Sequence, residues 1–538
     1  MVIECAEQEG APRPTHPDLT MGRVYVELHS AMSDLQPDAA ADDAPTSFAS
    51  LDLDGTTLVL RQMSSILDVM RLAVVSSTFA AATRATLATL EHLELAPEMC
   101  GDDESLSVWL SHAPALVSLE LGGLKELLLV ETFCFSTKLQ RLGLSETQID
   151  ATGLLGAWTS LPLLIALDLT ECSYLEGSEV EELVTAPPAS KCLAELSLAR
   201  CARVTAATAC HLCCLIGASL TNIDLGGYDD FGSENAQRIF EACGRGLRRL
   251  SLNESEGLDE ASVTHLATSA AELRVLDLSW CVEVGTGAVQ TLGAHCPMLM
   301  ELELRCCSGI EAVPAIAAIG RGCEHLNTLC LNRTGCSTFV DGDGGDDAPI
   351  ALITPLLRLH RLLVLDLGWL MELVTDESFG VLLRGLPLLS VLSVEGCKAL
   401  TDRALDALIS PTATDAAAAG ASASTEVASR LVRLNFAWVD GVSDAAMHAA
   451  LRSAHARVER SRQAHGRARR PDERLRGAEL QILDYYGRCW GVDADGQPAK
   501  CKLRLMGRGL PKGHPLKGWV NAHDADDAAE ALAQVEIS

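Results

Sequence analysis

One pattern constrains the fold of this chain more than any other: the motif LxxLxL recurs along most of its 538 residues. When the first leucine of each copy serves as the marker, the copies begin at Leu90, Leu116, Leu139, Leu164, Leu193, Leu220, Leu247, Leu273, Leu299, Leu326, Leu362, Leu389 and Leu431. Most markers stand about 26 residues apart, and the two long intervals run from Leu326 to Leu362 and from Leu389 to Leu431. A structural unit copied at a near-constant period indicates a repeat architecture rather than several unrelated domains.

Each copy has two halves with different periodicity. "LRVLDL" at Leu273 alternates apolar and polar residues, as a short strand with one buried face does. "TDESFGVLLRGL" at Thr375 carries apolar residues at helical spacing, after a Thr-Asp pair that suits a helix start. A strand and a helix in so few residues cannot bury their own apolar faces, but stacked copies can. We therefore expect an α/β solenoid, a horseshoe with a parallel β-sheet on the concave face and helices on the convex face.

The boundaries follow from the repeat. The solenoid is expected over residues 90–451, with loop insertions near 337–350 and 411–429, and "LQILDYY" at Leu480 is a candidate degenerate further copy. Residues 1–47 are polar and proline-containing, which is typical of a partly disordered segment. Residues 48–89 are expected to form a helical N-terminal element, and residues 452–538 a basic helical extension and a C-terminal cap or tail.

The repeat resembles the cysteine-containing subfamily of leucine-rich repeat proteins. The matching stretches are "CLAELSLARCARVT" at Cys192, "CPMLMELELRCCSGI" at Cys296 and "LSVLSVEGCKALTDRAL" at Leu389. The recurring cysteines are predicted to be core residues where the chain leaves the strand: Cys172, Cys201, Cys281, Cys307 and Cys397. The alternative, a zinc or redox site, is disfavoured because no paired CxxC motifs are present, so we expect neither a metal nor a cofactor.

Charge and motif content narrow the functional classes. A formal net charge of −31 argues against general binding to nucleic acid or anionic membranes. No leader or long apolar run is visible, and the 20 cysteines favour a reducing compartment, the cytoplasm or also the nucleus. The chain contains no nucleotide-binding, metalloprotease or serine-nucleophile motif, so we expect a non-catalytic protein that is monomeric by itself.

A protein-binding surface is predicted on the concave face. The residue between the second and third leucines should point inward, and it is often acidic. From this column we select Asp277, Glu303, Asp366 and Asn435, and along the adjacent edge Trp280, Trp369, Trp438, Arg305 and Arg333. The tryptophans have two interpretations, a rim residue covering its neighbour's turn or an anchor for a protein partner. The acidic column favours a basic protein segment as the partner.

The stretch "LVLRQMSSILDVMRLAVVSSTFAAAT" from Leu58 to Thr83 resembles the latter part of an F-box, although the usual opening "LP.E" is missing and the spacer before Asp68 is short. This resemblance implies a substrate receptor of an SCF-type ubiquitin ligase, acting in ubiquitin-dependent protein degradation with a Skp-type linker and a cullin as partners. The residues expected to bind the linker are Asp68, Val69, Met70, Leu72, Val75 and Phe79. The alternative is a helical cap on a scaffold or inhibitor protein that has no link to a ligase.

Overall fold

The computed structural model describes residues 77–95, 106, 110–124, 137–149, 151–186, 188–335, 348–371, 373–409, 431–464, 480–483, 486–492 and 497–500. The segments 1–47 and 411–429, and the insertion up to residue 347, lie outside the described residues. Two compact units are present, one up to Ala166 together with Ala186–Lys191, and one of Leu167–Thr185 together with the chain from Cys192 onward.

The first unit begins with a helix and continues with strands that pair in parallel. Its elements are α4 (Ser77–Leu87), β1 (His92–Glu94), β2 (Ser118–Glu120), β3 (Arg141–Gly143) and α6 (Ala151–Ser160). The strands are in register at equivalent repeat positions, with Leu93 opposite Leu119 and Leu119 opposite Leu142. These three leucines are buried, so the repeat pattern alone fixes which strand residues face the core.

The second unit repeats the alternation of strand and helix many times. Its strands are β5 (Glu195–Ser197), β6 (Asn222–Asp224), β7 (Arg249–Ser251), β8 (Val275–Asp277), β9 (Glu301–Glu303), β10 (Thr328–Cys330), β11 (Val364–Asp366), β12 (Val391–Ser393) and β13 (Arg433–Asn435). Its helices are α7 (Gly177–Thr185), α8 (Ala206–Ile216), α9 (Gly232–Cys243), α10 (Glu260–Ser269), α11 (Thr286–His295), α12 (Ala312–Gly322), α13 (Ala348–Ile353), α14 (Asp376–Gly385), α15 (Asp406–Ile409) and α18 (Asp444–Ala464). Short 3₁₀ helices are η3 (Gly217–Ser219), η4 (Gly244–Gly246), η5 (Thr354–Arg358) and η6 (Asp402–Leu405), and β4 (Ala166–Asp168) lies where the two units divide.

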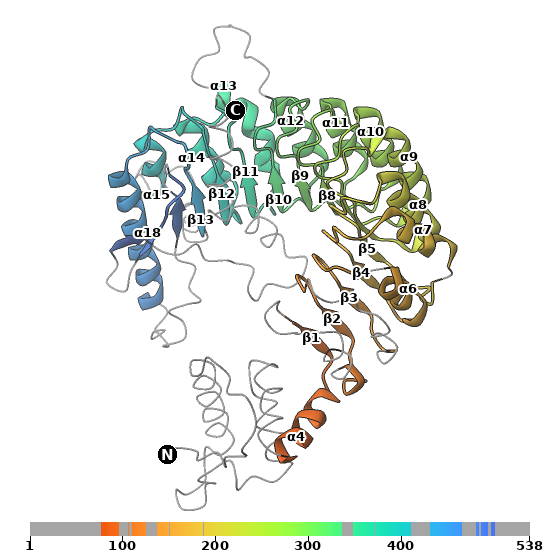
Figure 1. Ribbon diagram of the computed structural model, residues 1–538. Coiled ribbons are helices and arrows are strands. Elements are labelled where there is room, and N and C mark those ends of the chain that lie inside the picture. The colour runs from red at the N-terminus through yellow and green to blue at the C-terminus, as the bar shows by residue number, and fades with distance from the viewer. Residues whose placement is uncertain are drawn as a thin grey trace, which may run out of the picture. The chain divides into compact units, whose positions relative to one another are not determined.

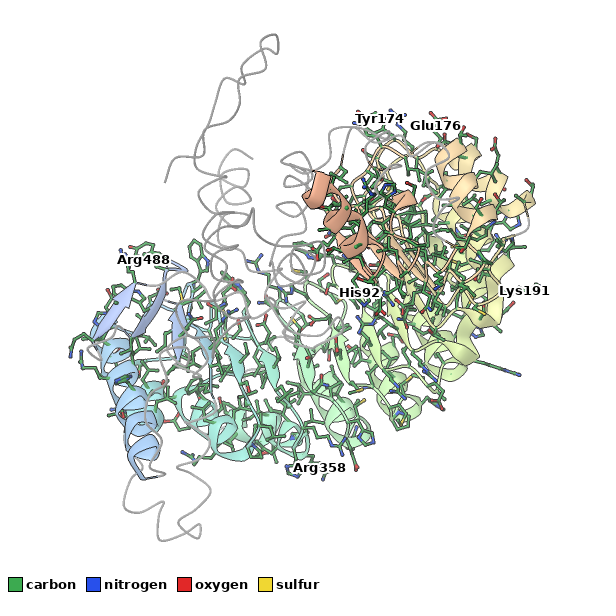
Figure 2. The ribbon with its side chains drawn as sticks, turned by 90° about the horizontal axis from the view of Figure 1, so that it is seen from below. His92, Tyr174, Glu176, Lys191, Arg358 and Arg488 are labelled. Carbon is green, nitrogen blue, oxygen red and sulfur yellow. The ribbon has the colours of Figure 1, made fainter. Side chains whose placement is uncertain are left out.

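From β5 to β13 each strand pairs in parallel with the next one along the chain. The strands line the inner side of a curved stack and the helices cover its outer side (Figure 1). Side chains fill the space between sheet and helices (Figure 2). The second unit is therefore a leucine-rich repeat solenoid, and the predicted fold class is confirmed.

The core follows the repeat position by position. If the marker leucine is position 0, the strand occupies positions 2 to 4, and positions 0, 3 and 5 are buried, as Leu273, Leu276 and Leu278 show with 0% exposure each. Position 8 is also buried and carries the recurring cysteines. Three-residue strands suffice because each gains its apolar burial from both neighbouring repeats as well as from its own helix.

The cysteines at position 8 have a second role besides filling space. The thiols of Cys201, Cys281 and Cys307 lie 3.1, 3.1 and 3.0 Å from the position 5 carbonyl oxygen of the preceding repeat. Ser255 and Tyr228 make the same contact from their hydroxyls in other repeats. Burial raises the pKa of the Cys201 and Cys281 thiols to about 12, so both remain protonated donors. Position 8 thus places a buried donor beneath the position 5 carbonyl of the preceding repeat.

Position 7 has an unusual backbone conformation. From the second copy to the last, every residue at this position has a positive φ: Gly123, Glu146, Glu171, Arg200, Gly227, Glu254, Trp280, Cys306, Arg333, Trp369, Gly396 and Trp438. The turn lets the amide of position 7 donate to the position 6 carbonyl of the next repeat, for example from Trp369 to Glu395 at 2.6 Å. These bonds continue the parallel ladder past the end of each strand.

The end of the described chain closes the sheet differently. Strand β14 (Gln481–Leu483) pairs in parallel with β13, with Ile482 opposite Leu434. Leu480 is therefore at position 1 of this degenerate copy rather than at the marker position. Strands β15 (Cys489–Val492) and β16 (Pro498–Lys500) follow as an antiparallel hairpin that extends the sheet. Helix α18 packs against this hairpin, since the rings of His448 and Trp490 lie 4.7 Å apart.

Candidate partner-binding surface

Two surfaces of the second unit carry the residues predicted to bind a partner. We call positions 2, 4 and 6 the inner face and position 7 the rim. The structure places Asp277, Glu303, Asp366 and Asn435 at position 4 of the inner face, and Trp280, Arg333, Trp369 and Trp438 on the rim. Arg305 was expected on the same edge as the tryptophans, and this was wrong: it directly follows Leu304 and lies at position 6, among the carboxylates.

The acidic column has a backbone role that the sequence pattern did not predict. A side-chain oxygen at position 4 accepts a hydrogen bond from the amide two residues later, at 2.9 Å from Ser279 to Asp277 and at 3.0 Å from Gly368 to Asp366. Asn435 accepts the Ala437 amide at 3.0 Å in the same way. Asp and Asn are favoured at such turns because their short side chains reach the backbone two residues on. Part of the acidic pattern is therefore explained by chain geometry alone.

The carboxylates gather around one guanidinium. Arg305 Nη2 lies 3.8 Å from Glu303 Oε2 and 4.0 Å from Asp366 Oδ2. Asn332 Nδ2 also donates to Asp366, at 3.2 Å to each carboxylate oxygen. The pKa of Glu303 is raised to about 8, mainly because the carboxyl is buried; Arg305 opposes this rise and the nearby carboxylates add to it. Burial likewise raises the pKa of Asp277. This part of the inner face therefore holds more carboxyl groups than its one nearby cation keeps ionised.

The inner face changes character at β10. At positions 2 and 4 of β5 to β9 the side chains are half-buried. At the same positions of β10 to β13 they are buried, including Asp366 at 0% and Asn435 at 3% exposure. Asp366 and Asn435 are therefore too buried to contact a partner directly and can act only through the residues that they hydrogen-bond. Asp277 and Glu303 remain partly accessible.

The rim tryptophans divide between the two interpretations. The Trp369 ring packs onto Gly396, where an added Cβ would lie 2.6 Å from Cδ2 of the ring. Its Nε1 donates to Glu395 Oε1 at 3.1 Å, and the Arg333 guanidinium lies 4.7 Å above the ring. Trp369 thus covers its neighbour's turn. Trp280 and Trp438 are 52% and 37% exposed, as a side chain available to a partner would be.

A second lateral contact on the rim was missed from the sequence. Arg200 pairs with Glu171 of the preceding repeat at 3.2 Å and, across Gly227, with Glu254 at 2.7 Å. These side chains are half exposed, so the pairs contribute little to stability. Tyr174, at the periphery of the unit in Figure 2, is 52% exposed beneath the Arg203 guanidinium. The repeat spacing could have aligned Glu171, Arg200 and Glu254, because all three stand seven residues after a marker leucine.

Of the F-box-like residues, only Phe79 lies within the described chain. Asp68, Val69, Met70, Leu72 and Val75 lie outside it. Phe79 belongs to helix α4, whose described side chains include the buried Ala82 and Leu87. The prediction that these residues bind a linker stays a prediction.

Neither a metal site nor a membrane helix is found in the part of the chain that the structure describes. No group of three or more His, Cys, Asp and Glu side chains there is arranged to hold a metal ion. None of the helices described above combines the length and the apolar character needed to cross a membrane.

Comparisons with known proteins give structural likeness without close sequence relatives. No protein-family model matches the chain. No curated protein matches it either. Among solved structures, a chain in the crystal structure of the yeast Rad7 and Elc1 complex is similar at 16% identity and a TM-score of 0.48, covering 88% of this chain and 99% of that one. An internalin from Listeria monocytogenes is similar at 13% identity and a TM-score of 0.33, covering 74% of this chain and 95% of that one. A leucine-rich repeat protein of Leptospira interrogans is similar at 15% identity and a TM-score of 0.37, covering 72% of this chain and 91% of that one.

Proposed function

We propose that this chain is a non-catalytic protein-interaction protein that binds a partner through its rim and the accessible part of its inner face. The observation that carries the proposal is the residue choice at position 7. A left-handed conformation costs an L-residue about 1–2 kcal/mol, and glycine fills the same position in three repeats. The exposed indoles of Trp280 and Trp438 are therefore not required by the turn, and backbone strain retained at an exposed aromatic is typical of a functional site.

The expected partner is a protein segment with a basic surface. Asp224, Asp277 and Glu303 lie along the half-exposed inner face next to Trp280, and burial raises the pKa of all three carboxyl groups. Lysine and arginine side chains of a partner would stabilise the ionised forms of these carboxyl groups, while an apolar residue packs against the indole. Arg305 is the one described guanidinium placed among these carboxylates in β8 and β9.

The more specific function we propose is that of a substrate-recognition subunit of an SCF-type ubiquitin ligase. What supports it is the F-box-like stretch from Leu58 to Thr83, which precedes the first repeat. In this arrangement Met70, Leu72 and Val75 contact a Skp-type linker, while the solenoid holds the protein to be degraded. The proposal makes the two ends of the chain act on different proteins.

One observation favours the alternative, a capped scaffold with no ligase link. Helix α4 contains the end of the F-box-like stretch, and Ala82 and Leu87 are buried within the first unit at 0% and 3% exposure. A helix that buries its apolar side chains ahead of the first strand can serve as a cap for the open end of a solenoid.

Affinity purification with mass spectrometry separates the two functions. The wild-type chain is expected to co-purify a Skp-type linker and a cullin, and Val69→Glu or Met70→Glu is expected to abolish this while the melting temperature stays unchanged. Arg84→Glu, in the last turn of α4, serves as a charge-altering control within the same helix region. A wild-type chain that never captures the linker, with glutamate variants that only melt earlier, would leave the capped scaffold.

A further inference from the structure

The two ends of the strands in the second unit differ in charge. In the six copies from Leu247 to Leu389, positions 4 to 8, where each strand ends and turns, contain five Asp or Glu and two Arg. Positions −6 to 2 of the same copies, where a helix ends and the next strand starts, contain eight Arg and four Glu. Positions 1 and 7 are up to about 20 Å apart along an extended chain. The cationic end is therefore a surface separate from the rim.

Some of these arginines have a role within the fold. Helices of the unit end on this side of the strands, and a cation in the last turn is stabilised by the partial negative charge at a helix C-terminus. Arg321 in α12 and Arg384 in α14 are placed in this way. Burial raises the pKa of Glu301 and Arg249 opposes this rise, so Arg249 is already matched by a carboxyl group of the inner face. These three arginines carry no argument for a ligand.

Three other arginines stand at the strand starts. Arg248 and Arg274 occupy position 1 of neighbouring copies, and Arg361 occupies position −1 three copies further on. The Arg274 amide donates to the Arg248 carbonyl at 2.8 Å, so these two residues lie side by side. Arg248 and Arg361 are exposed. Among the described residues, no ion pair joins any of the three to a carboxylate. Their charge is therefore available to a partner.

Two exposed methionines lie next to these arginines. Met298 and Met300 occupy positions −1 and 1 of the copy that follows Arg274, and they are 36% and 37% exposed. The Met300 amide donates to the Arg274 carbonyl at 2.7 Å, which places it beside that arginine. The solenoid does not require methionine here, since Asn327 and Ser390 occupy position 1 in other copies. A flexible thioether packs against many apolar shapes and is common at binding surfaces.

These residues belong to one continuous row across the strands. Each position 1 amide donates to the position 1 carbonyl of the preceding copy, in the order Thr221, Arg248, Arg274, Met300, Asn327, Leu363 and Ser390. Adjacent members are about 4.8 Å apart, so Arg248 and Leu363 are separated by roughly 19 Å. About six extended residues or thirteen helical ones cover this distance. A single short segment can therefore reach the cations and the methionines together. We call Arg248, Arg274, Met298, Met300 and Arg361 the strand-start patch.

We propose that the strand-start patch binds an acidic protein segment that also carries large apolar side chains. Its carboxylates pair with the guanidinium groups, whose planar geometry offers a carboxylate two parallel hydrogen bonds. Its apolar side chains pack on Met298 and Met300. Nucleic acids and anionic membranes fit less well, because the formal net charge of −31 repels an extended anionic surface, whereas a short segment meets only the patch.

The second unit then binds two partners of opposite charge. A basic partner occupies the rim and the accessible inner face at the strand ends, and an acidic one occupies the strand starts. The two surfaces share no residue. The failure of either binding proposal therefore leaves the other intact, and both are independent of linker binding at the N-terminal end of the solenoid.

A random dodecapeptide library displayed on phage tests the proposal, with the full-length chain as bait. Peptides recovered on the wild-type chain should be enriched in Asp and Glu interspersed with Leu, Phe or Met. They should be lost on a variant that combines Arg248→Glu and Arg361→Glu. The matched control combines Lys398→Glu and Arg403→Glu, two exposed cations outside the patch whose reversal changes the net charge equally, and it should retain them. Recovery without acidic enrichment, or equal recovery on the reversed variant, overturns the proposal.

Fluorescence anisotropy with the most enriched peptide separates the two contributions. The double reversal should weaken binding at least about 10-fold. Met300→Ser should weaken it about 3- to 5-fold, whereas Leu215→Ser, which changes a leucine 47% exposed on α8, should leave it unchanged. Trp280→Ala should also leave it unchanged, which distinguishes this surface from the rim. If the double reversal lowers the melting temperature, Arg248→Gln with Arg361→Gln replaces it, and wild-type affinity in that variant refutes the proposal.

The same titration with single-stranded RNA and with vesicles containing phosphatidylserine addresses the other anionic ligands. Neither should bind with an affinity that depends on Arg248 and Arg361. If one of them does while the acidic peptides do not, the strand-start patch is a phosphate-binding surface and the assignment to a protein segment is wrong.

Discussion

Gly396 offers a direct measure of how the rim is packed. Its φ is +66°, and an added Cβ would lie 2.6, 2.7 and 2.9 Å from three ring atoms of Trp369. Gly396→Ala therefore adds two costs. Alanine in the left-handed conformation costs about 1 kcal/mol. This value allows for the lower conformational entropy of the unfolded alanine variant, which offsets part of the backbone strain. The steric overlap with a ring held by Glu395 and Arg333 adds about 1–3 kcal/mol. We expect a total loss of about 2–4 kcal/mol in the free energy of unfolding.

Two comparisons isolate the steric part. Gly227→Ala changes the equivalent position of another repeat, at φ +81°, where the neighbour is the half-exposed and flexible Arg200 side chain. It should cost about 1 kcal/mol. In a Trp369→Ala background, Gly396→Ala should also fall to about 1 kcal/mol, which gives a coupling energy of about 1–3 kcal/mol for the pair.

Urea denaturation followed by circular dichroism measures these values, provided that the slopes agree between variants. Hydrogen exchange of the β11 and β12 amides shows whether the loss is local. If Gly396→Ala costs no more than Gly227→Ala, and the same with or without Trp369, then the indole does not rest on Gly396. The interpretation of Trp369 as a residue covering its neighbour's turn would then be wrong.

Three further predictions concern the core, pH dependence and binding. Cys281→Val should lower the free energy of unfolding by about 1–3 kcal/mol in urea, because the Leu252 carbonyl loses its donor at 3.1 Å, and Cys281→Ser, which keeps a donor, should cost less. The folded-state pKa of Glu303, raised to about 8 by burial, exceeds its ordinary value of 4.5, so the folded protein keeps a proton that the unfolded chain releases between these values. Stability should therefore fall as the pH rises from 4.5 to about 8, and Glu303→Gln should flatten this part of the profile; a flat wild-type profile would contradict the assignment. Trp280→Ala should weaken partner binding about 10-fold or more with an unchanged melting curve, and Trp438→Ala should do so only if the partner reaches that end of the solenoid.

The F-box-like segment shows what a sequence pattern supplies by itself. The pattern named six residues and a class of partner, and the linker experiment tests both.

The sequence by itself determined the repeat, the strand and helix of each copy, and the burial of leucines at positions 0, 3 and 5. Those features follow from local periodicity, since a period of two or of about 3.6 selects the face that can be buried whatever the neighbours are. Tertiary structure alone decided that position 7 is left-handed, that Asp277 and Asp366 hold the turns, and that Arg305 lies among carboxylates rather than beside the tryptophans. It also decided that Asp366 is covered while Asp277 stays half-buried. The burial of Asp366 and its contact with Arg305 depend on packing between different repeats. The turns at Asp277 and Asp366 are local, but they depend on backbone angles that the hydrophobic period does not specify.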